Sequence, residues 1–171
     1  KTKASACITT PNLTKFLPEG CVKLNVKNTL FAVTLASRMF YPMADIDYPD
    51  HNLTDSNKIG KLYPDVKFGK NVLIGKNVKI GVKTIVGSNS IIESNVNIGS
   101  NCVIGSLVTI KNSLIGSNVH IKDGSKIGTK GFGFIPINQN NLKTPQIGKV
   151  IIESNSEIGS NCTVDRGSIT D

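Results

Sequence analysis

Bulky apolar residues recur at every sixth position through the middle of this chain of 171 residues. Glycine usually follows the bulky residue, and a small or β-branched residue lies two positions before it, so the unit reads N-V-x-I-G-x. Repetition at a short fixed period is typical of proteins that stack repeated units into a solenoid. The bulky series is Leu62, Phe68, Ile74, Ile80, Val86, Ile92, Ile98, Ile104 and Ile110.

This repeat favours short strands over a helix. A glycine in every unit of a helix would cost about 0.5–1 kcal/mol relative to alanine, and a period of six does not match a helical turn. In an extended segment, Val72 and Ile74 point to the same side, and Gly75 and Asn77 supply the corner that follows. Three such units close a coil of about 18 residues whose strands pair in parallel with the next coil. The sequence therefore predicts an all-β parallel β-helix with the bulky series, Leu62 included, facing inward.

The repeat occupies residues 58–171, with one interruption. Its phase slips by one residue after Ile110, and it is broken over residues 129–146, where Gly131-Phe132-Gly133-Phe134 and two prolines lie. A solenoid accommodates such an insertion as a loop that leaves one corner, and such loops often have a functional role. We therefore expect an irregular loop at 129–146.

Residues before the repeat follow a different pattern. Ala4 to Thr9 and Cys21 to Val26 are typical of short strands, and Asn28 to Phe40 is typical of a helix with Asn28 as its N-cap. Residues 1–45 are too few to bury a good core, so we interpret them as the remnant of a small α/β domain, followed by a connector over residues 46–57.

Charge and cysteine content exclude several kinds of site. The net charge is +8, but the lysines are spread singly and no aromatic residues alternate with them, so nucleic acid is not expected as a partner. The four cysteines form no C-x-x-C pair, so no metal site is expected, and a reducing cytoplasm fits them best. Cys102 and Cys162 occupy the small-residue position of the repeat, where buried thiols are expected. No apolar run approaches the roughly 18 residues of a membrane span.

Four stretches together resemble a known family. They are K-A-S-A-C-I-T at residues 3–9, G-F-G-F at 131–134, P-Q-I-G-K-V-I-I at 145–152 and N-C-T-V-D-R-G-S at 161–168. In this order, and with hexapeptide repeats between them, they resemble the UDP-3-O-acylglucosamine N-acyltransferases of lipid A biosynthesis. The resemblance covers nearly the whole chain.

The resemblance implies a left-handed β-helix that forms a homotrimer with active sites between neighbouring β-helices. It implies transfer of a 3-hydroxyacyl chain from the phosphopantetheine thioester of acyl carrier protein to the 2-amine of UDP-3-O-acylglucosamine, without a bound cofactor or metal. The family's uracil-binding aromatic residues are expected before Lys1, and its general-base histidine beyond Asp171. The resemblance therefore assigns no catalytic residue to this stretch, and it implies a chain truncated at both ends that is inactive alone.

Four residues are candidates for substrate contacts. Phe132 and Phe134 could line a groove for an acyl chain or could pack the loop onto the solenoid. Asp165 and Arg166 follow inward-facing Val164 at a corner, where they could line a cleft between subunits or form a local ion pair.

The two histidines, His51 and His120, do not match the family's catalytic motif, and we interpret both as surface residues. Two other functions stay open. One is a non-catalytic, truncated β-helix from a decayed gene copy that serves only in assembly. The other is a sugar or serine O-acetyltransferase of the hexapeptide class that uses acetyl-CoA.

Overall fold

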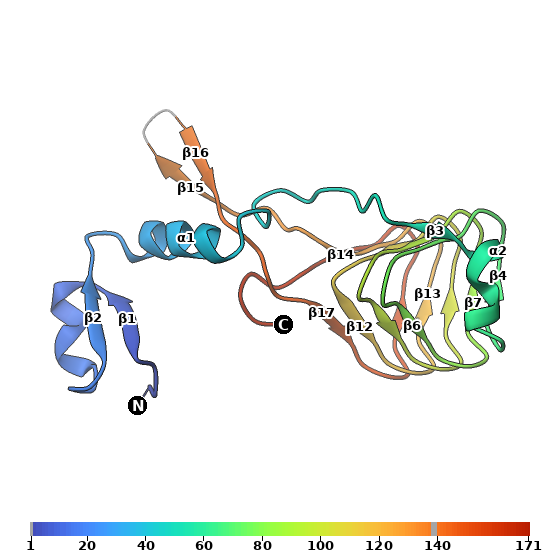
Figure 1. Cartoon of the computed structure of the whole chain (residues 1–171), viewed down its shortest axis with the longest axis horizontal. Coiled ribbons are helices and arrows are strands. Elements are labelled where there is room, and N and C mark those ends of the chain that lie inside the picture. The colour runs from blue at the N-terminus through green and yellow to red at the C-terminus, as the bar shows by residue number, and fades with distance from the viewer. Residues whose placement is uncertain (1, 138–139) are drawn as a thin grey trace. The chain divides into compact units, whose positions relative to one another are not determined.

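A computed structural model describes residues 2–137 and 140–171 of the chain (Figure 1). The chain forms two compact units. One comprises Lys1–Ile46 together with Phe132–Pro145, and the other comprises Asp47–Gly131 together with Gln146–Asp171. The segment that interrupts the repeat therefore groups with the N-terminal residues, and the repeat itself forms the larger unit.

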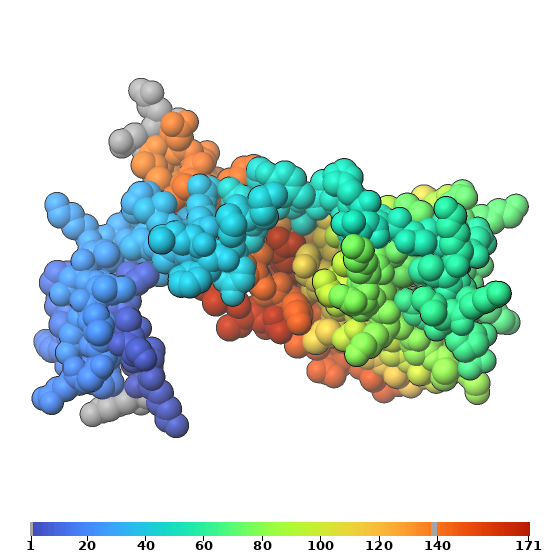
Figure 2. Space-filling model, viewed as in Figure 1, coloured from blue at the N-terminus to red at the C-terminus, as the bar shows by residue number. Residues whose placement is uncertain are grey.

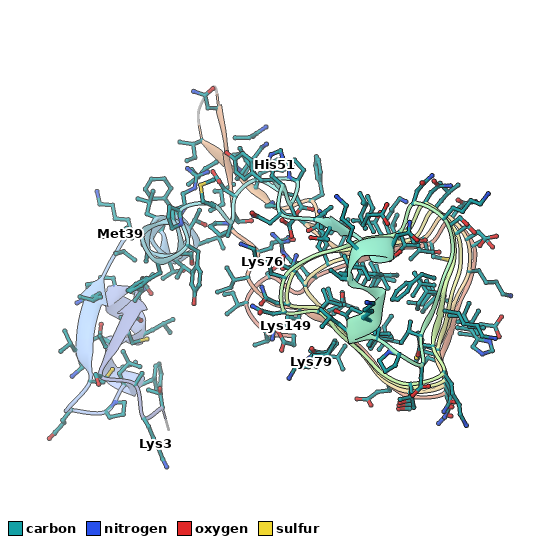
Figure 3. The ribbon with its side chains drawn as sticks, turned by 45° about the vertical axis from the view of Figure 1, so that its right-hand side comes forward. Lys3, Met39, His51, Lys76, Lys79 and Lys149 are labelled. Atoms are coloured by element: carbon teal, nitrogen blue, oxygen red, sulfur yellow. The ribbon has the colours of Figure 1, made fainter. Side chains whose placement is uncertain are left out.

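The larger unit is a three-sided parallel β-helix. Figure 3 shows its coils as a three-sided ring, with the exposed Lys79 side chain pointing away from the interior. One side consists of β4 (Lys67–Phe68), β7 (Ile85–Val86), β10 (Val103–Ile104), β13 (His120–Ile121) and β18 (Glu157–Ile158). The second consists of β5 (Leu73–Ile74), β8 (Ile91–Ile92), β11 (Thr109–Ile110), β14 (Lys126–Thr129) and β19 (Thr163–Asp165). The third consists of β6 (Lys79–Ile80), β9 (Asn97–Ile98), β12 (Ser113–Ile115) and β17 (Val150–Ile152).

The register of the strands explains the slip in the sequence period. Lys67 pairs with Ile85, and Ile85 pairs with Val103. The two residues of each pair are 18 positions apart in the sequence. Val103 then pairs with His120, only 17 residues later, so one coil is a residue shorter than its neighbours. His120 pairs with Glu157, 37 residues later, because the segment that leaves the β-helix lies between them. The parallel strands and the coil length predicted from the sequence are therefore confirmed.

The core is the set of stacked bulky residues. Ile74, Ile92 and Ile110 are at most 1% exposed, and the small residues two positions before them are also buried. Their burial stabilises the fold by about 25 cal/mol per Å² of apolar surface. Figure 2 shows the outside of the same coils, coloured from green to red. The buried apolar residues of the stack are Val72, Ile74, Val78, Val86, Ile92, Val96, Ile98, Cys102, Ile104, Val108, Ile110, Ile115, Val119, Ile121, Ile127, Val150 and Ile152.

Two predictions about the core are wrong in detail. Leu62 is 73% exposed, because it lies in the short helix η2 (Gly60–Leu62) before the first coil begins. Cys162 is half-buried, whereas Cys102 is buried as predicted. The first coil is covered by α2 (Ser56–Ile59) and by β3 (Thr54–Asp55), which pairs antiparallel with β5.

Asparagine at the corners relieves backbone strain. Asn71, Asn77, Asn89 and Asn95 have φ between 56° and 65°, a left-handed conformation that asparagine tolerates better than most residues. Their side chains also bond between coils, Asn71 Nδ2 to Asn89 Oδ1 at 3.1 Å and Asn77 Nδ2 to Asn95 Oδ1 at 3.2 Å. Leu107 occupies an equivalent corner with φ 59° and gains neither advantage.

The smaller unit contains the predicted strands and helix. β1 (Ala6–Thr9) pairs in parallel with β2 (Val22–Asn25), and the 3-10 helix η1 (Pro11–Phe16) connects them. The helix α1 (Thr29–Phe40) begins after Asn28, whose side chain accepts a hydrogen bond from the Phe31 N–H at 3.0 Å. The predicted N-cap is therefore confirmed.

The loop predicted as irregular contains a hairpin instead. β15 (Phe134–Ile137) pairs antiparallel with β16 (Asn140–Lys143), and residues 138 and 139 of the predicted loop lie outside the described residues. Ile135 is only 6% exposed, so the hairpin buries an apolar side chain within a stretch that is rich in proline and amide residues. The Arg38 guanidinium donates a hydrogen bond to the Lys143 carbonyl at 3.0 Å.

Among the helices of the described residues, none combines the length and apolar content needed to cross a membrane.

Charging the interior should unfold the β-helix. Ile98 is 4% exposed and pairs with Ile80 and Ile115 in the adjacent coils, so Ile98→Lys would bury an ammonium without a partner. We expect loss of the cooperative thermal transition in circular dichroism. The matched control is Asn97→Lys, because Asn97 is the exposed neighbour of Ile98 on the same strand. The Asn97→Lys protein should melt near the temperature of the parent. Similar melting of both variants would refute the inward orientation of Ile98.

Replacing the strained corner leucine should stabilise the protein. Leu107 is 57% exposed, so Leu107→Asn loses little burial and places in the left-handed conformation a residue whose short polar side chain tolerates it better than leucine does. We expect the free energy of unfolding in urea to rise by about 1 kcal/mol. The reverse change at an asparagine corner, Asn101→Leu, should lower it by a similar amount. A destabilised Leu107→Asn protein would contradict this account of the corners.

Candidate functional site

Charged side chains replace glycine along one corner of the β-helix. The strands β5, β8, β11 and β19 end at this corner, where glycine follows the bulky residue in the first coil as Gly75. In the next two coils the same position holds Glu93 and Lys111, and the last strand leads into Arg166. A parallel stack places equivalent positions of successive coils next to one another. The corner therefore brings together charges that are far apart in the sequence.

These charges form a network with the connector residue Asp47. Lys111 Nζ lies 3.1 Å from Glu93 Oε1 and 3.3 Å from Asp47 Oδ2. Arg166 Nη1 lies 3.1 Å from Asp47 Oδ1. The side chains of Lys111 and Arg166 are only 10% and 8% exposed, so both cations are paired in a largely desolvated place.

Gln146 completes the network at the point where the chain returns to the β-helix. It is buried, its carbonyl accepts a hydrogen bond from Arg166 Nε at 2.8 Å, and its side-chain oxygen accepts one from the Gly131 N–H. We call Asp47, Glu93, Lys111, Gln146 and Arg166 the corner cluster. Its two carboxylates balance its two cations, so it holds the chain in place and offers no uncompensated charge to a substrate.

Asp165 and Arg166 do not pair with each other. Asp165 is exposed and its Oδ1 accepts a hydrogen bond from Thr129 Oγ1 at 2.8 Å, whereas Arg166 is turned inward to Asp47. The local ion pair considered from the sequence is therefore wrong, because the two side chains leave the corner on different sides. Asp165 can still accept a hydrogen bond from a substrate amine or hydroxyl, and that role stays a prediction.

Gly128 shapes the chain beside the cluster. Its φ is +80°, and a β-carbon there would lie 1.6 Å from the Lys111 carbonyl oxygen. Only glycine fits this combination of conformation and space. Its own carbonyl accepts a hydrogen bond from Asn112 Nδ2 at 3.2 Å.

Phe132 and Phe134 lie together in the smaller unit. Their ring centroids are 5.3 Å apart in an edge-to-face arrangement. Phe132 is 95% exposed, so packing of its ring into a core does not explain its presence. An exposed aromatic pair can contact an apolar chain. Contact between these two rings and the acyl chain of a substrate stays a prediction.

Both histidines lie on the surface, as the sequence predicts. His51 is exposed on the connector (Figure 3), and His120 is exposed on β13. His120 pairs in register with Glu157, and that carboxylate bonds to Lys122, which lowers the pKa of Glu157. Neither histidine belongs to the corner cluster.

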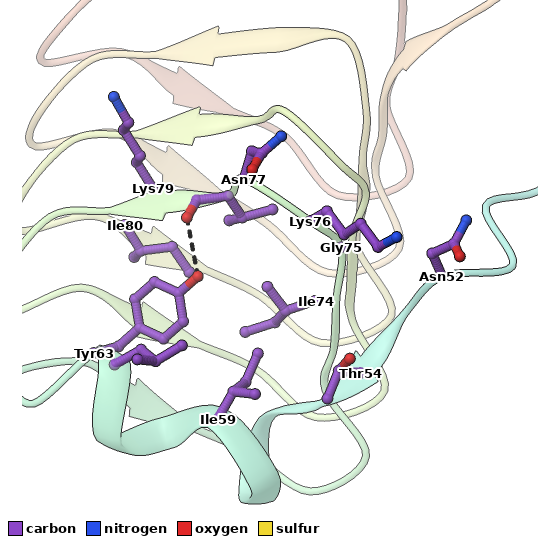
Figure 4. A pocket seen from close by; sticks show the side chains of 12 residues that line it. Asn52, Thr54, Ile59, Tyr63, Ile74, Gly75, Lys76, Asn77, Lys79 and Ile80 are labelled. Atoms are coloured by element: carbon purple, nitrogen blue, oxygen red, sulfur yellow. Dashed lines mark hydrogen bonds between the residues drawn. The ribbon is translucent and has the colours of Figure 1, made fainter.

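A cavity of about 580 Å³ lies at the first coil, away from the last strand of the stack (Figure 4). Ile59, Tyr63, Ile74 and Ile80 contribute to its wall, and Tyr63 Oη donates a hydrogen bond to the Val78 carbonyl at 2.9 Å. Burial raises the pKa of Tyr63. Its lining comes from residues 52–80, so all four predicted contact residues lie elsewhere. The cavity is the partly covered end of the solenoid core.

Within the described residues, no group of three or more His, Cys, Asp or Glu side chains is arranged to hold a metal ion.

Sequence reasoning missed most of the corner cluster. Glu93 and Lys111 gave a signal, because each breaks the run of glycines that follows the bulky residues. Asp47 and Gln146 gave no signal in the sequence. Their contacts depend on where the connector and the returning chain lie against the stacked coils. The sequence indicates Arg166 as a candidate residue, but it does not indicate its ion-pair partner, Asp47.

Comparisons with known proteins match the repeat and also the residues outside it. Residues 66–97, 90–110 and 149–170 match the family model described as the hexapeptide repeat of succinyl-transferase. The chain is 42% identical, over all of its 171 residues, to the UDP-3-O-acylglucosamine N-acyltransferase of Granulibacter bethesdensis. It spans about half of that relative, 50% of its length.

A solved structure of AntD, an N-acyltransferase from Bacillus cereus, has dTDP and coenzyme A bound to a point mutant. It aligns with a TM-score of 0.35 and 20% identity, over 68% of this chain and 72% of that chain.

Removing the buried lysine should cost far more than removing an exposed one. Lys111→Met leaves Glu93 and Asp47 without a shared cation in a desolvated corner, so we expect a loss of about 3 kcal/mol in urea unfolding. Lys122→Met is the control, since Lys122 and Glu157 are more than half exposed and solvent screens their pair, so its loss should change the free energy of unfolding little. Equal effects of the two substitutions would contradict the buried network.

Proposed function

We propose that this hexapeptide-repeat chain, which resembles UDP-3-O-acylglucosamine N-acyltransferase along its whole length, forms part of an enzyme with that activity. The reaction would transfer a 3-hydroxyacyl chain from acyl carrier protein to the 2-amine of UDP-3-O-acylglucosamine in lipid A biosynthesis. The observation that supports this most strongly is the 42% identity that extends over the full 171 residues, including the segments outside the repeat.

In this reaction the amine nitrogen attacks the carbonyl carbon of the acyl thioester. The amide C–N bond forms, the C–S bond to phosphopantetheine breaks, and the amine gives up a proton to a general base. The resemblance assigns that base to a histidine of the family's catalytic motif, which neither His51 nor His120 matches, so we assign binding and positioning roles to the residues of this chain. We assign the acyl contact to Phe132 and Phe134 and a polar contact to Asp165.

The geometry changes the role of Arg166. Its guanidinium is 8% exposed and bonds both Asp47 and the Gln146 carbonyl, so we assign it to the structure of the corner and not to substrate. The left-handed sense of the β-helix, assembly into a homotrimer and a cytoplasmic location are part of the same proposal, since they follow from the resemblance.

The two competing functions differ in the reaction that they allow. A hexapeptide-class sugar acetyltransferase would use acetyl-CoA, and a non-catalytic β-helix would transfer nothing. The match of the N-terminal residues and of the 132–145 segment to one N-acyltransferase favours the acyl carrier protein reaction over both.

A chimera tests this choice directly. The matching half of the Granulibacter bethesdensis enzyme is replaced by residues 1–171 of this chain, and the amide product is measured by mass spectrometry. We expect transfer from 3-hydroxyacyl carrier protein and none from acetyl-CoA. The control is the parent enzyme under the same conditions. A folded chimera that transfers no acyl chain would support the non-catalytic alternative, and transfer from acetyl-CoA would support the acetyltransferase.

A further inference from the structure

The chain passes between its two compact units three times, and each passage adjoins the corner cluster. The crossings lie between residues 46 and 47, 131 and 132, and 145 and 146. The residues on the β-helix side are Asp47, Gly131 and Gln146. All three are joined by hydrogen bonds or ion pairs within the β-helix unit.

Asp47 contacts three different parts of this unit with one carboxylate. Its Oδ1 accepts from Arg166 Nη1 at 3.1 Å, and its Oδ2 lies 3.3 Å from Lys111 Nζ. Oδ2 also accepts a hydrogen bond from the backbone N–H of Lys130 at 3.2 Å. The connector is therefore tied to the point where the chain leaves the β-helix.

Arg166 ties the connector to the returning chain. Its planar guanidinium donates from Nη1 to Asp47 and from Nε to the Gln146 carbonyl, a pair of directions that a lysine ammonium cannot reproduce. Gln146 in turn accepts from the Gly131 N–H through its side chain. Both ends of the segment 132–145 are thus fixed relative to Asp47.

Charge balance makes Asp47 necessary for this arrangement. Without its carboxylate, the buried Arg166 guanidinium would lose its only acidic partner among the ion pairs of the described residues. Lys111 would keep Glu93. An unpaired buried cation is costly, so the Arg166 side chain would turn toward solvent and release Gln146.

We propose that Asp47 is a positioning residue: its carboxylate, through Arg166 and the Lys130 amide, fixes both ends of the segment 132–145 and thereby the aromatic pair Phe132 and Phe134. The part that concerns the acyl contact depends on the function proposed above. The fixing of the segment ends does not.

Amide hydrogen exchange measured by NMR on the whole chain tests the fixing of the ends. Asp47→Asn should accelerate exchange at Lys130 and Gly131 by about 10-fold or more, while the Leu73 and Ile85 amides, which bond between coils, should stay within about 2-fold. Arg166→Lys should have the same local effect, and Asp47→Glu should restore slow exchange. Unchanged exchange at residues 130 and 131, or equal acceleration everywhere, would overturn the proposal.

Asp50→Asn is the matched control. Asp50 lies on the same connector and accepts hydrogen bonds from Ser94 Oγ at 2.6 Å and from the Ser94 N–H at 3.2 Å, which lower its pKa. Its hydrogen bonds come from Ser94 and Asn52, so exchange at Lys130 and Gly131 should match the parent. Acceleration there by Asp50→Asn would show that any loosening of the connector suffices.

Kinetics of the chimera test the consequence for substrate. Asp47→Asn should raise KM for the acyl substrate by about 10-fold with kcat nearly unchanged, and Phe132→Ala should raise KM similarly without changing exchange at residues 130 and 131. Faster exchange with an unchanged KM would overturn the link to substrate. An inactive parent chimera would instead refute the proposed function, and the exchange result would still decide the positioning role.

Discussion

Burial of branched aliphatic side chains between successive coils is the interaction on which this fold depends. A single coil has no core of its own, because its two-residue strands are too short to cover an apolar face. Stacking closes that face: Ile92 lies between Ile74 and Ile110, and all three are at most 1% exposed. Backbone hydrogen bonds between coils, such as that from the Leu73 N–H to the Ser90 carbonyl at 3.0 Å, hold the same spacing. Every other feature, including the corner cluster, uses that fixed spacing.

The sequence predicted this scaffold well because its determinants are local. The alternation of Val72 and Ile74, and the asparagine corners, each act within one hexad and recur in most of the others. The N-cap Asn28 was predicted for the same reason. Leu62 was misplaced because the period alone does not show where the first coil begins, and the hairpin at 134–143 was missed because proline and asparagine conceal its pairing.

The corner cluster shows the limit of such reasoning. Arg166 was selected as a residue at a corner, but its position next to Asp47 depends on a contact across 119 residues of sequence. No periodicity encodes that contact. What the sequence did contain was a departure from its own rule, since Glu93 and Lys111 stand where glycine is expected. In a repeat protein, positions that break the repeat are therefore better guides to special roles than positions that obey it.

The shortened coil has a consequence for how such a chain can vary. From Ile110 the next bulky inward residue, Ile115, follows after five positions and not six, and the corner between them contains Lys111. The strands on both sides keep their pairing, so the lost residue was absorbed entirely by the bend. A deletion inside a two-residue strand would instead turn the side chains of that strand to the opposite face. Gains and losses of residues in a lineage of such proteins should therefore accumulate at bends. The segment 132–145 is an insertion of this kind that is long enough to form a hairpin.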